Sequence, residues 1–307
     1  MSLQEKTEWI AVDWGQTRQR VWLMGAGGNL LAERSADQGM ERLTRDGFET
    51  TLLAMIEDFL SDAITTPVLC SGMVGSAEDW AEVPFQAVPC APQSADSFVT
   101  ARTDDARIAV TILPGLSQTS PAPDLMRGEE TQIAGFLQSN PKFDGVLVMP
   151  GTHSKWVHIS AEEVVSFQTF LTGELYALLA RQSVLRNAVA IGGWDDAAFE
   201  SGVSEAISRP ESVAAKLFSL QAQSQLAQGT PEAARARLSG LLIGMELAAT
   251  RPYWLGQNLT VLAAPDIGKI YARALSLQGL QAPVLDSAPL VREGLQTAYE
   301  ALTAAKD

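Results

Sequence analysis

Two similar segments, about half a chain apart, constrain the fold of this chain more than any other feature. The first, WIAVDWGQTRQRVWLM at residues 9–24, has an apolar strand, a glycine-containing turn and a second strand. The second, VLVMPGTHSKWVHI at residues 146–159, repeats this order, and its Gly151 takes the place of Gly15. Each segment predicts a β-hairpin. Their repetition indicates two domains of related construction.

The first turn has the composition of a phosphate-binding loop. Gly15 lets the backbone approach a ligand closely, Thr17 adds a hydroxyl donor and Arg20 adds a cation. Asp13, just before the turn, is a carboxylate of the kind that holds a hydrated magnesium ion. An ordinary hairpin turn also uses Asp and Gly. The nucleotide interpretation therefore gains its weight from the second segment.

Composition excludes several classes of protein. The 307 residues suffice for two domains, and 46% hydrophobic with 19% charged residues is typical of a globular protein. A net charge of -14 argues against a nucleic-acid partner, which needs clustered Lys and Arg. Cys70 and Cys90 form no Cys-x-x-Cys pair and no histidine cluster accompanies them. Neither a disulfide framework nor a zinc site is expected.

The chain shows no targeting or membrane segment. Its polar start, MSLQEKTE, leads directly into the first strand and lacks the features of a signal peptide. No window reaches the roughly 18 consecutive apolar residues of a membrane helix. We therefore expect a cytoplasmic protein with neither a membrane nor a nucleic acid among its partners.

Beyond the hairpins, hydrophobic periodicity predicts alternating helices and strands, which is typical of an α/β fold. A loop-rich stretch ends near Asp124, and a domain boundary there gives domains at residues 1–124 and 125–307. The expected helices are residues 48–63, 172–185, 268–277 and two within 211–250 that break at 229–231, and the expected strands include 30–34, 66–71, 108–113 and 259–264.

Two adjacent acids, Glu129 and Glu130, follow Arg127 and Gly128 at the start of a predicted helix. A carboxylate there is often a capping residue, which stabilises the helix by a few tenths to about one kcal/mol. The position also suits a catalytic base that accepts the proton of a substrate hydroxyl as it attacks the terminal phosphate of ATP. The residues themselves leave both interpretations open.

Six motifs spread over nearly the whole chain follow one another in the order of a known family. They are DWGQTRQR at 13–20, SGMVGS at 71–76, MRGEETQ at 126–132, MPGTHSKWV at 149–157, FLTGEL at 170–175 and LSGLLIG at 238–244. In this order they resemble the 2-dehydro-3-deoxygalactonokinase family, sugar-acid kinases of the actin, Hsp70 and hexokinase superfamily. The resemblance implies an α/β fold of two actin-like (ribonuclease H-like) domains with a cleft between them.

The resemblance also implies a reaction. It predicts a kinase that uses ATP and Mg²⁺ to phosphorylate the terminal 6-hydroxyl of 2-dehydro-3-deoxy-D-galactonate in galactonate catabolism, with closure of the cleft excluding water. Two alternatives stay open, a kinase of this fold that acts on another sugar or sugar acid, and a nucleotide-dependent sensor without catalysis. The oligomeric state stays open as well, a homodimer included.

Carried over residue by residue, the resemblance assigns roles within the two hairpins. Asp13 would orient magnesium, Gly15, Thr17 and Arg20 would hold phosphate in the first domain, and Gly151 and Thr152 would form the phosphate loop of the second. Glu129 matches the position of the catalytic Asp of related carbohydrate kinases, so it is the expected base in preference to Glu130. A Glu at this position departs from the pattern of those kinases.

Further candidates surround these motifs. His153 and Lys155 follow the second loop and suit phosphate binding, although His153 also suits a structural hydrogen bond and Lys155 an exposed hairpin position. His158, in a predicted strand, is the less favoured histidine. Candidate partners for the carboxylate of the sugar acid are Arg127, Arg42 and the loop with Ser71, Gly72 and Met73.

Two expectations concern apolar surroundings. Trp14 and Trp156 are expected in the cores rather than stacked on a sugar, because aromatic residues dominate cores. The adenosine site is expected in the second domain, where the strand at 259–264 runs into the turn Pro265-Asp266-Ile267-Gly268. This turn is poorer in glycine than that of related kinases, which leaves the contacts of the adenine base unassigned.

Overall fold

The computed structural model describes residues 3–16, 18–37, 39, 43–76 and 79–304. By its internal contacts the chain divides into two compact units. Unit 1 comprises Met1–Phe143, Ala161–Val165 and Ser287–Asp307, and unit 2 comprises Asp144–Ser160 and Ser166–Asp286. None of the helices in the described part of the chain is both long enough and apolar enough to span a membrane.

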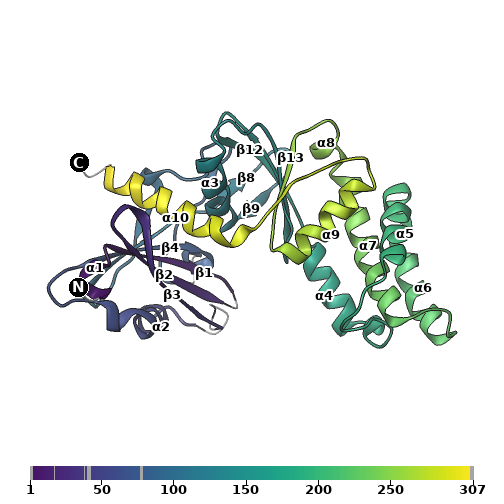
Figure 1. Cartoon of the computed structure of the whole chain (residues 1–307), viewed down its shortest axis with the longest axis horizontal. Coiled ribbons are helices and arrows are strands. Elements are labelled where there is room, and N and C mark those ends of the chain that lie inside the picture. The colour runs from purple at the N-terminus through teal and green to yellow at the C-terminus, as the bar shows by residue number, and fades with distance from the viewer. Residues whose placement is uncertain (1–2, 17, 38, 40–42, 77–78, 305–307) are drawn as a thin grey trace. The chain divides into compact units, whose positions relative to one another are not determined.

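Unit 1 contains a sheet whose strands lie in the order β3-β2-β1-β4-β7-β6 (Figure 1). Its elements are α1 (Leu3–Lys6), β1 (Trp9–Trp14), β2 (Gln19–Gly25), β3 (Asn29–Ala36), α2 (Gly47–Ile56), β4 (Thr66–Gly72), β5 (Gln86–Ala87), β6 (Val99–Thr100), β7 (Ile108–Ile112), β8 (Leu116–Gln118), β9 (Asp124–Met126), α3 (Glu129–Ser139) and α10 (Ser287–Ala304). Strand β2 is antiparallel to both β1 and β3, whereas β4 is parallel to both β1 and β7.

Helices cover both faces of this sheet, and the two-residue period of β1 divides its side chains between two cores. On one face Val12 of β1 packs in a core with Phe48 of α2. On the other face α10 contributes Leu295 to a core with Trp9, whose ring stacks on Tyr299 at 4.5 Å between ring centroids. Cover on both faces explains why β1 is an almost continuous apolar run.

Helix α3 packs closely against α10 through glycines. A side chain on Gly135 of α3 or on Gly294 of α10 would overlap the backbone carbonyl of the facing helix. Because α3 packs on α10, unit 1 continues through α3 to Phe143. It also includes α10, which lies at the C-terminal end of the chain. This division differs from the boundary expected near Asp124, since a loop-rich stretch does not reveal which later helix packs back on the first sheet.

Unit 2 contains a second sheet, in the order β12-β11-β10-β13-β14 (Figure 1). Its elements are β10 (Gly145–Met149), β11 (Ser154–Ser160), β12 (Glu163–Phe170), α4 (Thr172–Gln182), α5 (Asp196–Ser208), α6 (Val213–Gln225), α7 (Pro231–Ala249), α8 (Arg251–Trp254), β13 (Leu259–Leu262), α9 (Pro265–Ser276) and β14 (Val284–Leu285). The first residues of β12 group with unit 1, because Val164 pairs there with Cys90.

The two sheets have the same construction. In each, the first strand of the hairpin lies at the centre, antiparallel to the second and parallel to a later strand, β4 in unit 1 and β13 in unit 2. Helices follow the third strand of each sheet and lead to the parallel strand. This repetition confirms the expected α/β fold with two ribonuclease H-like units.

Local signals account for several helix boundaries. Helix α7 begins where predicted, because the Thr230 side chain accepts a hydrogen bond from the Ala233 amide and Pro231 occupies the first turn. The helix expected over residues 48–63 is shorter, since α2 ends at Ile56 and passes into a 3₁₀ turn at Glu57–Phe59. Strand β12 and helix α10 were not expected from the sequence.

Candidate active site

Asp13 and Arg20 form an ion pair across the first hairpin. The antiparallel register of β1 and β2 places them opposite each other. Arg20 donates from Nη2 to Asp13 Oδ2 at 2.7 Å and from Nε to the same oxygen at 3.1 Å. The two side chains are 23% and 22% exposed. The cation expected to hold phosphate thus already neutralises the carboxylate expected to orient magnesium.

The turn that joins β1 and β2 is closed by its own backbone. The Gly15 amide donates to the Arg18 carbonyl at 2.9 Å. A Cβ on Gly15 would lie 3.2 Å from the same carbonyl oxygen, which favours glycine here. Thr17, assigned to phosphate, lies outside the described residues, as does Arg42.

Gly72 ends β4 directly beside β1. Its φ of +93° is a conformation that side-chain-bearing residues rarely adopt, and a Cβ there would lie 2.5 Å from the Trp14 carbonyl oxygen. Ser71, just before it, is paired with Asp13 in the parallel register. Ser71 is fully buried, and its Oγ has no hydrogen-bond partner among the described residues. Met73 opens the 3₁₀ turn that follows.

A second glycine brings the start of α3 to the same place. Gly128, with a φ of +110°, precedes α3, and a Cβ on it would lie 3.3 Å from the Cα of Gly72. The ends of β1 and β4 and the start of α3 therefore meet in unit 1. This arrangement brings the strand that carries Asp13 to the helix start that carries Glu129.

The two adjacent acids have different environments. Glu130 is fully buried, and both of its carboxylate oxygens accept from the Gly128 amide, at 2.7 and 2.9 Å. Burial first, and the neighbouring Glu129 carboxylate second, raise the pKa of Glu130 to about 7. Glu129 is half-buried and accepts from the Arg127 amide at 3.1 Å. Glu130 is therefore the capping residue, and Glu129 is the more accessible acid.

Arg127 is held under the loop that follows β4. Its guanidinium lies over the Phe85 ring, 4.1 Å from the centroid, and Nη2 donates to the Val83 carbonyl at 3.0 Å. Nη1 packs against Gly75 and is buried with no hydrogen-bond partner among the described residues. Burial lowers the pKa of Arg127. Arg127 and Ser71 are thus both buried donors with unused capacity.

In unit 2, the loop between β10 and β11 lies against the start of α4. Gly151 and Thr152 are exposed, and Gly173 of α4 packs so closely on the Gly151 carbonyl that it has no room for a side chain. The Glu174 amide donates to the Thr152 carbonyl at 2.9 Å. His153 Nε2 lies 2.7 Å from Glu174 Oε2. This contact favours the structural alternative for His153 and fixes the shape of the loop.

The remaining candidates of unit 2 lie within strands or cores. Lys155 is only 4% exposed, and its Nζ donates to Thr169 Oγ1 at 2.8 Å. An exposed hairpin position for Lys155 is therefore wrong. His158 is half-buried in β11. Trp14 of unit 1 and Trp156 of unit 2 are fully buried in their cores, as expected.

A pocket of about 190 Å³ adjoins the Gly151 loop within unit 2. Its lining is mainly apolar, and consists of Gly151, Thr172, Gly173, Tyr176, Trp194, Arg235, Ser239, Leu242, Ile243, Ile267, Ile270 and Tyr271. Ile267 lies in the segment 265–268 where the adenosine site was expected, and this segment is the first turn of α9 and not a separate turn before it. Such a lining, with few polar groups, is typical of a small-molecule site.

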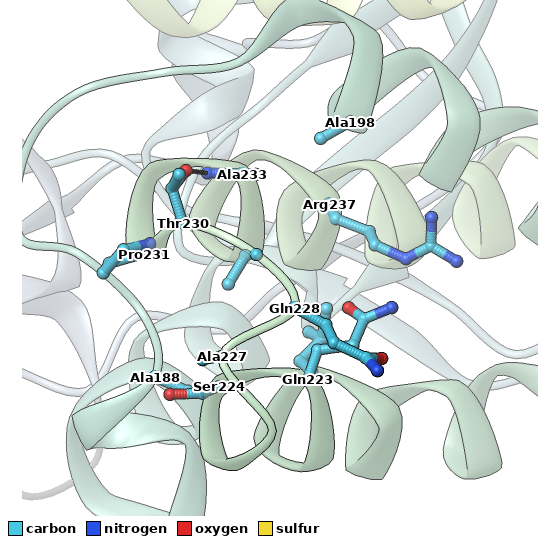
Figure 2. Close-up of a pocket in the computed structure, with 13 residues that line it drawn as sticks. Ala188, Ala198, Gln223, Ser224, Ala227, Gln228, Thr230, Pro231, Ala233 and Arg237 are labelled. Atoms are coloured by element: carbon cyan, nitrogen blue, oxygen red, sulfur yellow. Dashed lines mark hydrogen bonds between the residues drawn. The ribbon is translucent and has the colours of Figure 1, made fainter.

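A larger pocket, of about 450 Å³, lies among α5, α6 and α7 (Figure 2). Gln223, Gln228 and Arg237 line it, and Thr230 at the start of α7 lies at its other side. Arg237 is already paired with Glu205 at 2.7 Å. None of the site residues predicted from the sequence lines this pocket, so we place no function in it.

Sequence reasoning missed a buried acid that is hydrogen-bonded to two residues lining the 190 Å³ pocket, Thr172 and Tyr271. Glu246 of α7 is 1% exposed and accepts hydrogen bonds from Trp156, Thr172 and Tyr271. Its motif context, LSGLLIGMEL, is mostly apolar, and a single acid within an amphipathic helix usually faces solvent. The sequence around Glu246 therefore gave no signal that this acid faces inward.

Comparison with known proteins identifies the family. Residues 13–298 match the family described as 2-keto-3-deoxy-galactonokinase. A relative from Rhizobium meliloti (strain 1021), named "Probable 2-dehydro-3-deoxygalactonokinase DgoK1", is 37% identical over 96% of this chain and 97% of its own. The 2-dehydro-3-deoxygalactonokinase of Escherichia coli (strain K12) is 31% identical over 96% of this chain and 98% of its own.

A solved structure agrees with these relatives. The crystal structure of a 2-dehydro-3-deoxygalactonokinase family protein from Sinorhizobium meliloti superposes with a TM-score of 0.87, at 35% identity and with 96% of each chain covered. The residues that match the family, 13–298, include every motif that carried the resemblance. The chain belongs to the 2-keto-3-deoxy-galactonokinase family.

Proposed function

We propose that this protein is an ATP-dependent kinase that transfers the γ-phosphoryl group to the 6-hydroxyl of 2-dehydro-3-deoxy-D-galactonate. The observation that carries the proposal is the family match over residues 13–298, which includes all the predicted site residues. The names of two relatives, each covered over nearly its whole length, state this activity for those proteins. Both products would be anionic, ADP and the 6-phosphate of the sugar acid.

Glu129 is the proposed catalytic base. It would accept the proton of the 6-hydroxyl while that oxygen forms a bond to the γ-phosphorus and the bond to the leaving ADP oxygen breaks. Its partial exposure leaves it within reach of a substrate, whereas the capping contacts of Glu130 occupy both oxygens of that acid. The meeting of β1, β4 and α3 supports this role, because it fixes the helix start from which Glu129 projects.

The residues of the first hairpin fit a magnesium ion. Both hydrogen bonds from Arg20 end on Oδ2 of Asp13, which leaves Oδ1 outside this ion pair. A single carboxylate oxygen with phosphate oxygens and water completes the coordination that Mg²⁺ prefers. The ion would neutralise part of the negative charge of the phosphates. Gly15, Thr17 and Arg20 would bind phosphate oxygens beside it.

The nucleotide is proposed to lie with its adenosine in the 190 Å³ pocket of unit 2. Gly151, which lines that pocket, and the following Thr152 would contact phosphate. The base would pack between apolar walls such as Trp194 and Ile270, and Ser239 offers a hydroxyl to the ribose. His153 and Lys155 would support the phosphate-binding loop without contacting phosphate themselves, since each is already hydrogen-bonded within unit 2.

The carboxylate of the sugar acid is proposed to bind near Arg127 and Ser71. Each has a buried donor without a partner among the described residues, and such donors gain most from an anion. Gly72 and Met73 would supply backbone contacts. Because Gly75 covers Arg127 Nη1, we expect the 73–76 turn to move when the substrate binds.

The experiment that tests the function is a direct product assay. The protein, ATP and Mg²⁺ are incubated with 2-dehydro-3-deoxygalactonate or with its gluconate epimer, and mass spectrometry follows the gain of one phosphate. A gain on the galactonate compound alone supports the proposal. A gain only on another sugar or sugar acid shows that the proposed substrate is wrong and that the protein is a kinase for that compound. Nucleotide binding without any phosphorylated product contradicts the kinase assignment.

One conservative variant tests the base. Glu129→Gln should lower kcat by about 10²–10⁴, the usual contribution of a general base, while nucleotide affinity and Tm stay unchanged. Turnover near that of the unmodified protein would remove Glu129 from the mechanism.

A further inference from the structure

Glu246 is a buried acid that the proposed mechanism does not use. Trp156 Nε1 donates to its Oε1 at 2.8 Å. The Tyr271 hydroxyl donates to Oε2 at 2.8 Å, and Thr172 Oγ1 donates to the same oxygen. Ser154 Oγ in turn lies 2.9 Å from the Tyr271 hydroxyl. Only an ionised carboxylate accepts from three donors at once without bringing a donor of its own.

Burying an ionised carboxylate at this position has a high free-energy cost. All the hydrogen-bond partners of Glu246 among the described residues are uncharged side chains, and burial raises its pKa while those hydrogen bonds oppose the shift. A buried charge without a cation is stabilised only by its donors, and apolar residues often fill such sites at lower cost. The surrounding sequence of α7 is apolar, so a leucine at 246 would suit stability alone.

The partners of Glu246 are attached to the borders of the proposed nucleotide pocket. Thr172 is the first residue of α4, next to Gly173, which packs on the Gly151 carbonyl. Tyr271 lies on α9, and both Thr172 and Tyr271 line the pocket. Trp156 lies on β11, the strand that leaves the Gly151 loop. Helix α7 itself contributes part of the lining.

We propose that Glu246 is a positioning residue for the nucleotide: by holding β11, α4 and α9 to α7, its carboxylate sets the pocket beside Gly151 to the dimensions of the bound adenosine. The proposal rests on the proposed function, because it takes this pocket as the nucleotide site. It predicts an effect on nucleotide affinity that is separate from the effect on the sugar acid.

The test is Glu246→Gln, measured by the KM for ATP, the Kd for ADP from calorimetry, kcat and the KM for the sugar acid. The amide places a donor against one of the three existing donors and loosens at least one contact. Loss of a hydrogen bond to a charged group predicts a rise on the order of tenfold in the ATP and ADP constants. The value of kcat and the KM for the sugar acid should not change.

Glu205→Gln is the matched control. Glu205 is also a helical acid of unit 2 with several partners, Lys216 and Arg237 among them, but neither it nor these partners line the 190 Å³ pocket. This variant should leave all four constants unchanged. If Glu246→Gln fails to fold, Tyr271→Phe removes one donor and keeps the ring in the pocket wall, and it should raise the ATP and ADP constants in the same selective way.

Ser239→Trp separates this proposal from the proposed function. Filling the pocket should abolish ADP binding if the nucleotide lies there. Unchanged ADP binding by Ser239→Trp overturns the pocket assignment, and with it this proposal. If Ser239→Trp abolishes binding but Glu246→Gln lowers only Tm, or changes both KM values equally, Glu246 is a structural residue and the positioning role is refuted.

Discussion

Backbone geometry leaves Gly72, near the candidate active site, little freedom. It ends β4 with φ +93° and ψ -156°, in a region of backbone space that is essentially restricted to glycine. A Cβ at this position would lie 2.5 Å from the carbonyl oxygen and 3.0 Å from the carbonyl carbon of Trp14. Because β1 is fixed in the centre of the sheet, the Trp14 backbone has little room to move away.

Gly72→Ala should therefore be destabilising for two separate reasons. The unfavourable backbone conformation costs about 1–3 kcal/mol. Overlap with a fixed backbone adds about 1–3 kcal/mol, as for other insertions into packed regions. The sum is about 2–6 kcal/mol, which for a domain of this size corresponds to a fall in Tm of roughly 5–20 °C.

Gly27→Ala provides the matched control for this measurement. Gly27 also has a positive φ, +63°, but no atom lies within 4 Å of where its Cβ would be. Thermal unfolding followed by circular dichroism should show a shift for Gly27→Ala of about 1 kcal/mol, from the backbone term alone. If Gly72→Ala shifts Tm no more than Gly27→Ala, the close approach of β4 to β1 does not constrain this residue, and the argument fails.

Three further predictions follow from the burial and charge of single residues. Asp13→Asn should raise the Mg²⁺ concentration needed for half-maximal activity and lower kcat, yet change stability by at most about 1 kcal/mol, because the pair with Arg20 is partly exposed; a large loss of Tm would contradict this. The pKa of Glu130 rises from 4.5 to about 7, so the folded state binds more protons than the unfolded chain between these values. The free energy of unfolding should accordingly fall as pH rises from 4.5 to 7 in urea titrations, and a Glu130→Gln variant that keeps the same slope would refute the assignment. Burial raises the pKa of Cys70 far above its usual range, so iodoacetamide should label Cys70 only after unfolding and Cys90 earlier, as read by peptide mass mapping.

The elements that sequence alone could predict are those determined by local pattern. The apolar runs of β1 and β10 are buried on both faces, and the short turns after them fix the register of the hairpins. The register then sets Asp13 opposite Arg20, because four residues separate Trp14 from Gln19. An ion pair between them follows from this register, although the individual roles assigned to these residues did not anticipate it.

Long-range packing accounts for what the sequence could not reveal. The pairing of α3 with α10 depends on two glycines more than 150 residues apart, Gly135 and Gly294, and neither is unusual in its own helix. Glu246 is similar, since its three donors come from β11, α4 and α9. Only the folded chain shows that an acid within an apolar helix faces inward.

The adjacent acids show how structure decides between two interpretations that sequence leaves open. An acidic helix start can be explained by capping, and both oxygens of Glu130 accept from the amide of Gly128, the residue before the helix. Capping therefore accounts for Glu130, whereas Glu129 accepts from the Arg127 amide, which precedes the helix. Glu129 is half-buried, adjacent to Gly128 and so held beside Gly72 and the strand of Asp13. This half-buried position beside the strand of Asp13, on a backbone that Glu130 helps to hold, is the geometric reason for proposing Glu129 as the base for phosphoryl transfer.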